Sequence, residues 1–263
     1  MTETDWVIGR TSDGVAVVRY RRGEREGLPW ADLLEVLDGT GAVDPVEFVR
    51  TTMPGWAVSG SAEFGRELLA RGATPLRHAH TLRRDLVADP PPADWAEAPL
   101  RDGLRAVPCD RAPEELFDAW RAAFAPGHVD RFAGDDRQAL AKRLVPLLAG
   151  TAIGPVLPAS RLAVDADDRV VGGVVLTDRA GVPWVGEVFR HPGLGYPGLG
   201  ADLLRRAVAD CARRGLAEVQ LTVTEGNPAR RLYERLGFTP AQTSLTVIVP
   251  GTAPATAPAP ATG

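Results

Sequence analysis

The stretch His191-Pro-Gly-Leu-Gly-Tyr-Pro-Gly-Leu-Gly200 contains four glycines in ten residues and stands directly before an amphipathic segment. Glycine lets backbone N–H groups approach a phosphate closely, and the first turn of a helix adds further N–H donors. The stretch is therefore expected to hold a pyrophosphate. Which cofactor carries that pyrophosphate depends on the register in which the glycines are used.

Two registers of the glycine stretch predict different cofactors. Gly193 to Gly198 matches the G-x-G-x-x-G pattern of dinucleotide-binding folds, in which the helix begins inside the motif and an acidic residue ends the next strand. Here the helical pattern starts only near Gly200, and Glu218 opens the next strand. A nicotinamide or flavin cofactor is therefore disfavoured. In the later register, Gly198-Leu-Gly200 leads directly into the helix.

The segments around the glycines predict a mixed sheet with helices. Valine-rich alternation, a tight Asp167-Asp168 turn and 3.6-residue periodicity identify strands and helices in the order strand, two helices, three strands, glycine loop, helix, strand, helix, strand. The three strands before the loop are expected to pair antiparallel. The predicted strands are residues 104–107, 161–166, 169–176, 182–189, 218–224 and 244–249, and the predicted helices are residues 113–124, 135–148, 201–214 and 227–236.

Two motifs resemble those of the GNAT superfamily of N-acetyltransferases. Val188-Phe-Arg-His-Pro192, Gly198-Leu-Gly200 and Leu203-Leu204 resemble the acyl-CoA-binding motif, and Asn227-Pro-Ala-Arg-Arg-Leu-Tyr-Glu-Arg-Leu-Gly-Phe238 resembles the second hallmark of the family. The resemblance runs from about residue 104 to residue 249. It implies the GNAT fold, an α/β fold of the α+β type with a mixed, mostly antiparallel central sheet flanked by helices.

The resemblance also implies that acetyl-CoA is the co-substrate. The glycine loop and the following helix N-terminus would hold the pyrophosphate, and backbone amides at the end of the preceding strand would pair with pantetheine and polarise the thioester oxygen. The family usually carries Arg or Gln three residues before the first glycine of Gly198-Leu-Gly200, where this chain has Gly195. The implied cofactor-binding residues are Val188, Phe189, Arg190, Gly195, Tyr196, Gly198, Leu199, Gly200, Ala201, Asn227 and Tyr233.

Two residues are candidates for proton transfer. Tyr233 stands where the family carries a phenol that protonates the CoA thiolate, and the alternative is that it packs against the sheet beside Leu232 and Leu236. Glu187, on the strand that enters the loop, is the candidate general base acting through water. The alternative for Glu187 is a carboxylate paired with an arginine.

Other polar residues carry weaker interpretations. Asn227 is expected to cap the helix that begins at Pro228, which is compatible with a role in cofactor support. His128 and Asp130 stand where the family builds its acceptor site, and a histidine in a polar loop is otherwise simply solvated. His78 and His80 share one face of a predicted strand, but no third ligand is evident, so no metal site is expected.

Composition limits the class of protein. The formal net charge of −4 argues against a sequence-independent nucleic-acid binder. The two cysteines stand in no metal-ligand spacing, and the sequence contains neither a signal peptide nor a long apolar run. We therefore expect a cytoplasmic protein without nucleic-acid or membrane partners. A homodimer is left open.

The predicted organisation comprises four parts. Residues 1–88 are a smaller, non-catalytic α/β domain, 89–99 a proline-rich linker, 100–249 the acetyltransferase domain, and 250–263 a disordered tail. Both domains contain a helix, a glycine, Thr-Pro and a strand, at residues 64–82 and again from residue 232. This parallel suggests that the first domain is a degenerate partial copy of the second, without a glycine loop.

The sequence favours an acetyl-CoA-dependent N-acetyltransferase that modifies a primary amine of a small molecule. Two alternatives stay open: an acetyltransferase acting on protein lysines or N-termini, and a non-catalytic acyl-CoA-binding regulatory module. The loss of the usual residue at Gly195 is the reason to keep the last alternative.

Overall fold

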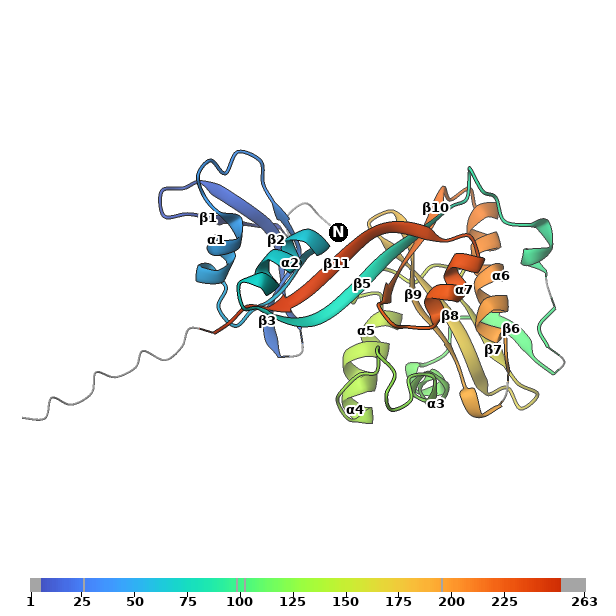
Figure 1. Ribbon diagram of the computed structural model, residues 1–263. Helices are drawn as coiled ribbons and strands as arrows, with labels where there is room; N and C mark the ends of the chain where they lie inside the picture. Colours follow the sequence, from blue (N-terminus) through green and yellow to red (C-terminus); the bar gives the residue numbers. More distant parts are fainter. Residues whose placement is uncertain (1–5, 26, 98, 102, 195, 252–263) are drawn as a thin grey trace, which may run out of the picture. The chain divides into compact units, whose positions relative to one another are not determined.

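The computed structural model describes residues 6–25, 27–97, 99–101, 103–194 and 196–251 (Figure 1). The chain divides into two compact units. The larger unit comprises His80–Ala241, and the smaller unit combines Thr2–Ala79 with Gln242–Gly263. Two strands, β5 (Thr74–Asp85) and β11 (Thr239–Ile248), therefore contribute residues to both units.

The bounds of these units differ from the predicted ones. The boundary falls inside β5 instead of at residues 89–99, and the last strand of the chain belongs mostly to the smaller unit. The proline-rich segment is not a free linker, because it forms the short 3₁₀ helix η2 (Ala93–Ala96) and packs Trp95 against the core of the larger unit. The predicted tail from residue 252 onward lies outside the described residues.

The larger unit consists of a mixed sheet with helices on both faces, as predicted. Its strands follow the order β11-β5-β10-β9-β8-β7-β6. The pairs β6/β7, β7/β8 and β8/β9 are antiparallel, and β9/β10 is parallel. The elements in chain order are β6 (Arg105–Pro108), α3 (Pro113–Ala123), α4 (Asp136–Ala139), η3 (Leu140–Leu144), α5 (Val145–Leu148), β7 (Arg161–Val164), β8 (Val170–Arg179), β9 (Val182–Arg190), η4 (Pro192–Leu194), α6 (Leu199–Arg213), β10 (Glu218–Thr224) and α7 (Ala229–Arg235).

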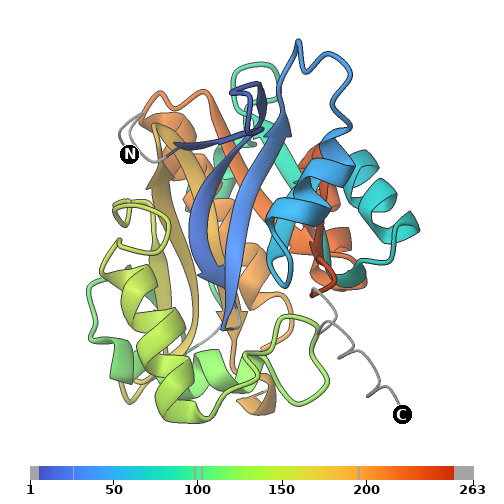
Figure 2. The same cartoon turned by 90° about the vertical axis from the view of Figure 1, so that its left-hand side faces the viewer.

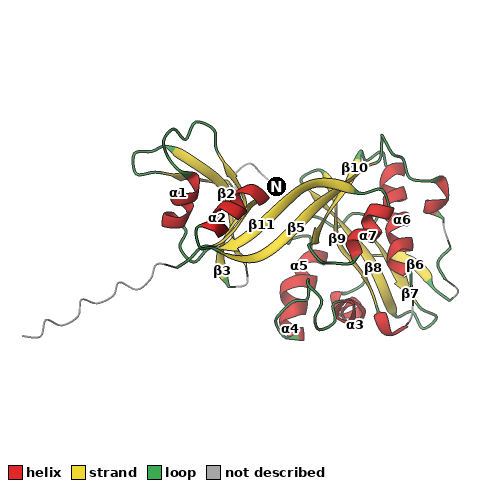
Figure 3. Cartoon of the chain, viewed as in Figure 1, coloured by secondary structure: helices red, strands yellow, loops and turns green. Residues whose placement is uncertain are grey.

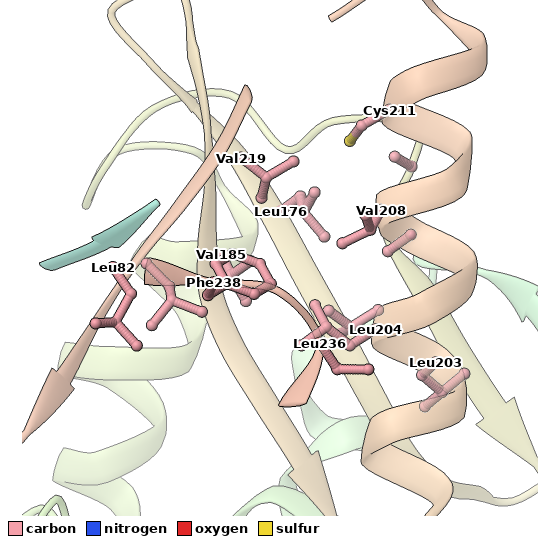
Figure 4. Packing of buried hydrophobic residues seen from close by; sticks show 14 of the residues in the cluster. Leu82, Leu176, Val185, Leu203, Leu204, Val208, Cys211, Val219, Leu236 and Phe238 are labelled. Atoms are coloured by element: carbon pink, nitrogen blue, oxygen red, sulfur yellow. The ribbon is translucent and has the colours of Figure 1, made fainter. Parts of the chain in front are cut away.

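Alternation along β7 shows how the two faces are covered. Leu162 is fully buried in the cluster beneath α3, whereas the next residue, Ala163, is fully buried in the cluster beneath α6. Successive strand residues point to opposite faces, so α3 and α6 lie on opposite sides of the sheet. Figure 4 shows the apolar stripe of α6 directed at the strands; its labelled residues include Leu203, Leu204, Val208 and Cys211 of α6 and Leu176, Val185 and Val219 of the sheet.

The helix predicted over residues 135–148 is one run with an irregular middle (Figure 2). Asp135 caps its start by accepting from the Gln138 N–H. The run then passes through a π turn, η3, in which the Val145 N–H bonds the carbonyl oxygen of Leu140. Pro146 follows and has no N–H to donate, which removes one hydrogen bond of the regular helical pattern. Arg143 lies in this π turn, whereas the sequence periodicity predicts a regular helix through the same residues.

The smaller unit has its own core and its own helices (Figure 3). Its strand order is β1-β2-β3-β4-β11-β5, in which β3/β4 is parallel and β1/β2, β2/β3 and β4/β11 are antiparallel. The sequence predicted α2 and β5 here but none of the other elements. Its further elements are β1 (Trp6–Arg10), β2 (Ala16–Arg25), β3 (Leu28–Val36), α1 (Pro45–Thr52), β4 (Ala57–Ser61) and α2 (Ala62–Ala70).

The two units repeat one order of elements. Three antiparallel strands are followed by a crossover helix, a strand parallel to the third, a helix and a last strand: β1-β2-β3-α1-β4-α2-β5 in one half of the chain and β7-β8-β9-α6-β10-α7-β11 in the other. The helices α2 and α7 are each followed by a glycine with positive φ, Gly72 and Gly237. The last strands then begin at Thr74 and Thr239. This repeat in topology supports the interpretation of the first unit as a copy of the second.

Candidate active site

The glycine loop ends in a residue that only glycine suits. Gly198 precedes the first turn of α6 with φ of 87°, in the left-handed region that other residues rarely adopt. The first helical hydrogen bond runs from the Asp202 N–H to the Gly198 oxygen, so the N–H groups of Gly200 and Ala201 lie in the turn before it and point out of the helix end. Gly195, which the sequence also assigns to this loop, lies outside the described residues.

Gly200 is constrained by packing as well as by its position in the loop. A Cβ atom at Gly200 would lie 3.3 Å from Val188 Cγ1 on β9. The missing side chain thus brings the first turn of α6 against the last residues of β9. Leu199 is buried in the core, and Tyr196 packs against the same core. The loop is therefore held between β9 and α6 from both ends.

A β-bulge in β9 decides which way Glu187 points. Val175 pairs with Glu187, but Leu176 pairs with Val185, so Gly186 is an extra residue in this strand. Val185 and Val188 consequently both pack on the α6 side, although they are three residues apart. The bulge places Glu187 on the opposite side, where the Trp120 Nε1–H of α3 donates to its Oε2 at 3.1 Å. Bulges re-aim side chains in this way.

The last residues of β9 contribute differently to a cofactor site. The Phe189 side chain is buried in the α3 cluster with Leu116 and Trp120. Only its backbone is therefore available to a cofactor. Arg190 is half-buried, and the Val188 side chain packs on α6. The β9/β10 pairing involves Gln220 with Trp184 and Leu221 with Val185; among the described residues no pair beyond these is formed, although both strands continue.

Glu187, Tyr233 and Asp130 form a partly buried polar cluster. They come from β9, from α7 and from the loop between α3 and α4. Burial raises the pKa of Glu187 to about 7, against the opposing charge of Arg143 and the Trp120 hydrogen bond, and the negative charge of Asp130 adds slightly to the increase. A carboxyl group with this pKa exchanges a proton readily near neutral pH.

Tyr233 is kept in its protonated form. Burial, followed by the charges of Glu187 and Asp130, raises the pKa of the Tyr233 phenol above its ordinary value. Its ring contacts Phe238 edge to face, with centroids 6.1 Å apart, and packs against the core. Tyr233 thus has both features considered from the sequence: its ring packs, and its hydroxyl lies near the two carboxyl groups. These two roles are compatible.

Asn227 caps α7 as predicted, and its amide has a second partner. Its Oδ1 accepts from the Ala229 N–H at 2.8 Å, and its Nδ2 donates to Asp130 Oδ2 at 2.8 Å. Asp130 Oδ1 also accepts from the Thr224 hydroxyl at 2.5 Å. The sequence did not connect Asp130 with Asn227 or Thr224, because residues almost a hundred positions apart give no local signal.

The histidines occupy different settings. The His128 ring packs edge to face on Phe124, with centroids 5.1 Å apart, and its Nδ1 accepts from the Asp130 N–H. His128 thus helps to shape the loop that presents Asp130. His80 is 8% exposed, and its Nε2 lies 2.5 Å from Glu225 Oε2. Ligand atoms of His78, His80 and Glu225 lie within 4.8 Å of one another, so Glu225 is the third candidate metal ligand that was not evident from the sequence.

The crossover helix of the smaller unit differs at the equivalent end. Helix α1 is preceded by Asp44, whose carboxylate accepts from the Val46 and Glu47 N–H groups. Pro45 at the first position has no N–H, and Arg71 forms an ion pair with Asp44 at 2.5 Å. A protein carboxylate therefore caps the start of α1, whereas α6, the corresponding helix of the larger unit, starts from the glycine loop.

Comparisons with known proteins agree with the fold. The chain is similar to a GCN5-related N-acetyltransferase from Sphaerobacter thermophilus (21% identity, 96% of this chain and 84% of that chain covered, TM-score 0.61). It is also similar to a tandem GNAT protein from the clavulanic acid biosynthesis pathway (17%, 94% and 84%, 0.59) and to a GCN5-related N-acetyltransferase from Kribbella flavida (19%, 93% and 88%, 0.57). No curated protein matches the chain.

The class is therefore that of the GNAT fold. Residues 114–238 match the model of the acetyltransferase (GNAT) family, so this region is a GNAT acetyltransferase domain. The family implies acetyl transfer with acetyl-CoA as the donor. Among the described residues, no helix is long and apolar enough to cross a membrane.

Proposed function

We propose that the protein is an acetyl-CoA-dependent N-acetyltransferase that acts on a primary amine of a small molecule. The observation that supports this most is the cluster of Glu187 and Tyr233. Two groups suited to opposite proton transfers come from β9, which precedes the glycine-loop helix α6, and from α7, which follows α6 and β10. Acetyl transfer to an amine requires one group to accept a proton and another to donate one.

The donor is held by backbone groups of the larger unit. The Gly200 and Ala201 N–H groups at the start of α6 bind the pyrophosphate of acetyl-CoA, with Tyr196, Gly198 and Leu199 shaping the loop. The backbone at Val188–Arg190, at the end of β9, pairs with the pantetheine arm. An N–H group there, directed at the thioester oxygen, stabilises the negative charge that develops during attack. Asn227 supports this arm through the position of α7.

Glu187 acts as the base. Its carboxylate takes a proton from the acceptor ammonium through water, and the neutral amine then attacks the thioester carbon. A base with a pKa of about 7 is half ionised at neutral pH. The rate should therefore rise with pH through this region until Glu187 is fully ionised.

Tyr233 acts as the acid. When the carbon–sulfur bond breaks, the electron pair stays on sulfur, and the Tyr233 hydroxyl donates its proton to the thiolate. The products are the amide and free CoA. The attacking nitrogen gives its second proton to the Tyr233 phenolate, which restores the phenol, and Glu187 releases the first proton to solvent. The raised pKa of Tyr233 favours a protonated phenol before each turnover.

A screen of small amines with acetyl-CoA, following release of free thiol, tests the proposed function. With an accepted amine, Tyr233→Phe should lower turnover by about 10² to 10⁴ and leave acetyl-CoA binding close to that of the parent. Tyr20→Phe is the matched control, because Tyr20 is buried against Trp56 in the smaller unit. Equal turnover in Tyr233→Phe and parent would assign the proton to another donor. Acetyl-CoA binding without transfer to any amine or peptide would favour the non-catalytic module.

A further inference from the structure

The Asp130 carboxylate joins three segments of the larger unit. It stands in the loop between α3 and α4, accepts from Thr224 at the last position of β10, and accepts from Asn227, two residues before α7. Each oxygen takes one of these two side-chain hydrogen bonds. Asp130 therefore fixes both the end of β10 and the start of α7 from across the site.

The same contacts continue into α7. Asn227 uses its other side-chain atom, Oδ1, to accept from the Ala229 N–H and so caps the helix. The helix is short, from Ala229 to Arg235, and has no fully buried residue of its own. A helix of about two turns depends on its cap for a defined start. Asp130 thus determines where α7 begins, and Tyr233 lies five residues into this helix.

We propose that Asp130 is a positioning residue, which through Asn227 and Thr224 sets the place of α7 and hence of the Tyr233 hydroxyl relative to Glu187. This inference rests on the proposed function. Misplacement of a reacting group by about 1 Å lowers rates by on the order of 100-fold. Loss of both Asp130 contacts should therefore reduce turnover more than it reduces acetyl-CoA binding.

Two substitutions of Asp130 separate geometry from charge. In Asp130→Asn, the amide oxygen accepts from Asn227 while its NH₂ donates to the Thr224 hydroxyl, which is able to rotate and accept. Asp130→Asn thus keeps both contacts and removes the charge, whereas Asp130→Ala removes both. A residue that acts only through its charge would make the two variants equally impaired. A positioning residue predicts that Asn rescues what Ala loses.

The experiment measures kcat and KM for acetyl-CoA and for an accepted amine over a range of pH in the full chain. Asp130→Ala should lower kcat at least about tenfold with a smaller change in the acetyl-CoA KM. Asp130→Asn should stay within about threefold of the parent. The increase of its activity with pH should also begin at a lower pH than in the parent, because the Asp130 charge no longer raises the pKa of Glu187. Thr224→Val should lower kcat in the parent but add little in Asp130→Ala.

Hydrogen exchange of the amides of residues 227–235 tests the same proposal without activity. Exchange should be faster in Asp130→Ala and parent-like in Asp130→Asn. Parent-like exchange and kcat in Asp130→Ala, or equal losses in both variants, would overturn the proposal. If Asp130→Ala does not fold, parent-like exchange and kcat in Thr224→Val overturn it. If the parent transfers acetyl to no amine, the proposed function fails, while parent-like exchange in Asp130→Ala and in Thr224→Val separately refutes the positioning by Asp130.

Discussion

The buried position of Glu187 is one where a neutral side chain would make the folded protein more stable than an ionised carboxylate does. The β-bulge at Gly186 turns it toward α3, where burial raises its pKa from 4.5 to about 7. The ionised form is therefore less favourable in the folded protein than in the unfolded chain. The cost to stability is absent below the unfolded pKa, grows as pH rises, and is complete above the folded pKa.

Glu187→Gln should therefore stabilise the protein in a pH-dependent way. The gain should reach up to about 3 kcal/mol at pH 8 and shrink as pH falls from 7 toward 4.5, because a neutral amide replaces an ion that folding disfavours. Urea unfolding at pH 8 and at pH 5 measures the gain. The same substitution at the exposed Glu63 serves as control. A gain that does not change with pH would contradict an origin in the ionisation of Glu187. The variant should also lose the rise in activity near pH 7.

At the scale of residues, the sequence identified those that belong to a motif or a local pattern. It did not reveal contacts between residues that are far apart in the sequence. Tyr233 and Gly198 stand at fixed places in two motifs, and Asn227 before proline is a recognisable helix cap. Asp130 was identified only as a residue of the acceptor side. Its actual partners, Thr224 and Asn227, lie 94 and 97 residues away. No periodicity links positions at such separations.

At the scale of elements, the two ends of α6 offer a controlled comparison. Gly198 precedes the helix with φ of 87°, and Gly215 follows it with φ of 74°. Neither would place a Cβ in a severe clash: at Gly198 the nearest atom is 3.9 Å away, and at Gly215 none lies within 4 Å. An alanine at either position thus carries the same backbone strain, but only Gly198 belongs to the proposed cofactor loop.

Gly198→Ala and Gly215→Ala should each lower the free energy of unfolding by about 1 to 2 kcal/mol. Only Gly198→Ala should weaken acetyl-CoA binding, by about tenfold or more, because backbone donors shift away from the pyrophosphate. Urea unfolding and calorimetric titration measure the two effects. Equal acetyl-CoA affinity in the two variants would place the pyrophosphate elsewhere.

The regular elements of the larger unit were predictable because strong periodicity marks them. The predicted 218–224 strand coincides with β10, and α6 begins two residues earlier than predicted. The bulge in β9 and the π turn η3 were not predictable, since each depends on a single shift in hydrogen-bond register. In the first fifty residues, β1–β3 and α1 were missed.

At the scale of the whole molecule, the two units share a topology but carry different residues at the places that correspond to the candidate site. The larger unit has the glycine loop before α6 and Tyr233 in α7, the second helix of the repeated topology. In the smaller unit, the Asp44 carboxylate caps the start of the crossover helix α1. The fully buried Leu68 lies four residues before Gly72, at the place that corresponds to Tyr233, which lies four residues before Gly237. A second anionic pyrophosphate at α1 would meet both a carboxylate and a proline without an N–H.

The protein should therefore bind one acetyl-CoA per chain. Calorimetric titration of the full chain should give a stoichiometry of one, and Gly198→Ala should weaken that single event. Asp44→Ala, which removes the competing carboxylate, should leave the stoichiometry at one, because Pro45 and the missing glycine loop remain. Two binding events per chain would refute this division between the units.

The pairing of β4 with β11 affects how the chain folds during its synthesis. Residues 57–61 pair with residues 244–248, and Val247 and Val249 complete the core of the smaller unit. During synthesis this unit emerges first from the ribosome, yet it lacks an internal strand for roughly 10 to 40 seconds, until residues 244–248 are added. In that interval β4 presents an unpaired edge to other nascent chains. The smaller unit therefore cannot complete its fold until β11 has been synthesised. Chaperone binding to the nascent chain should be greatest before translation ends.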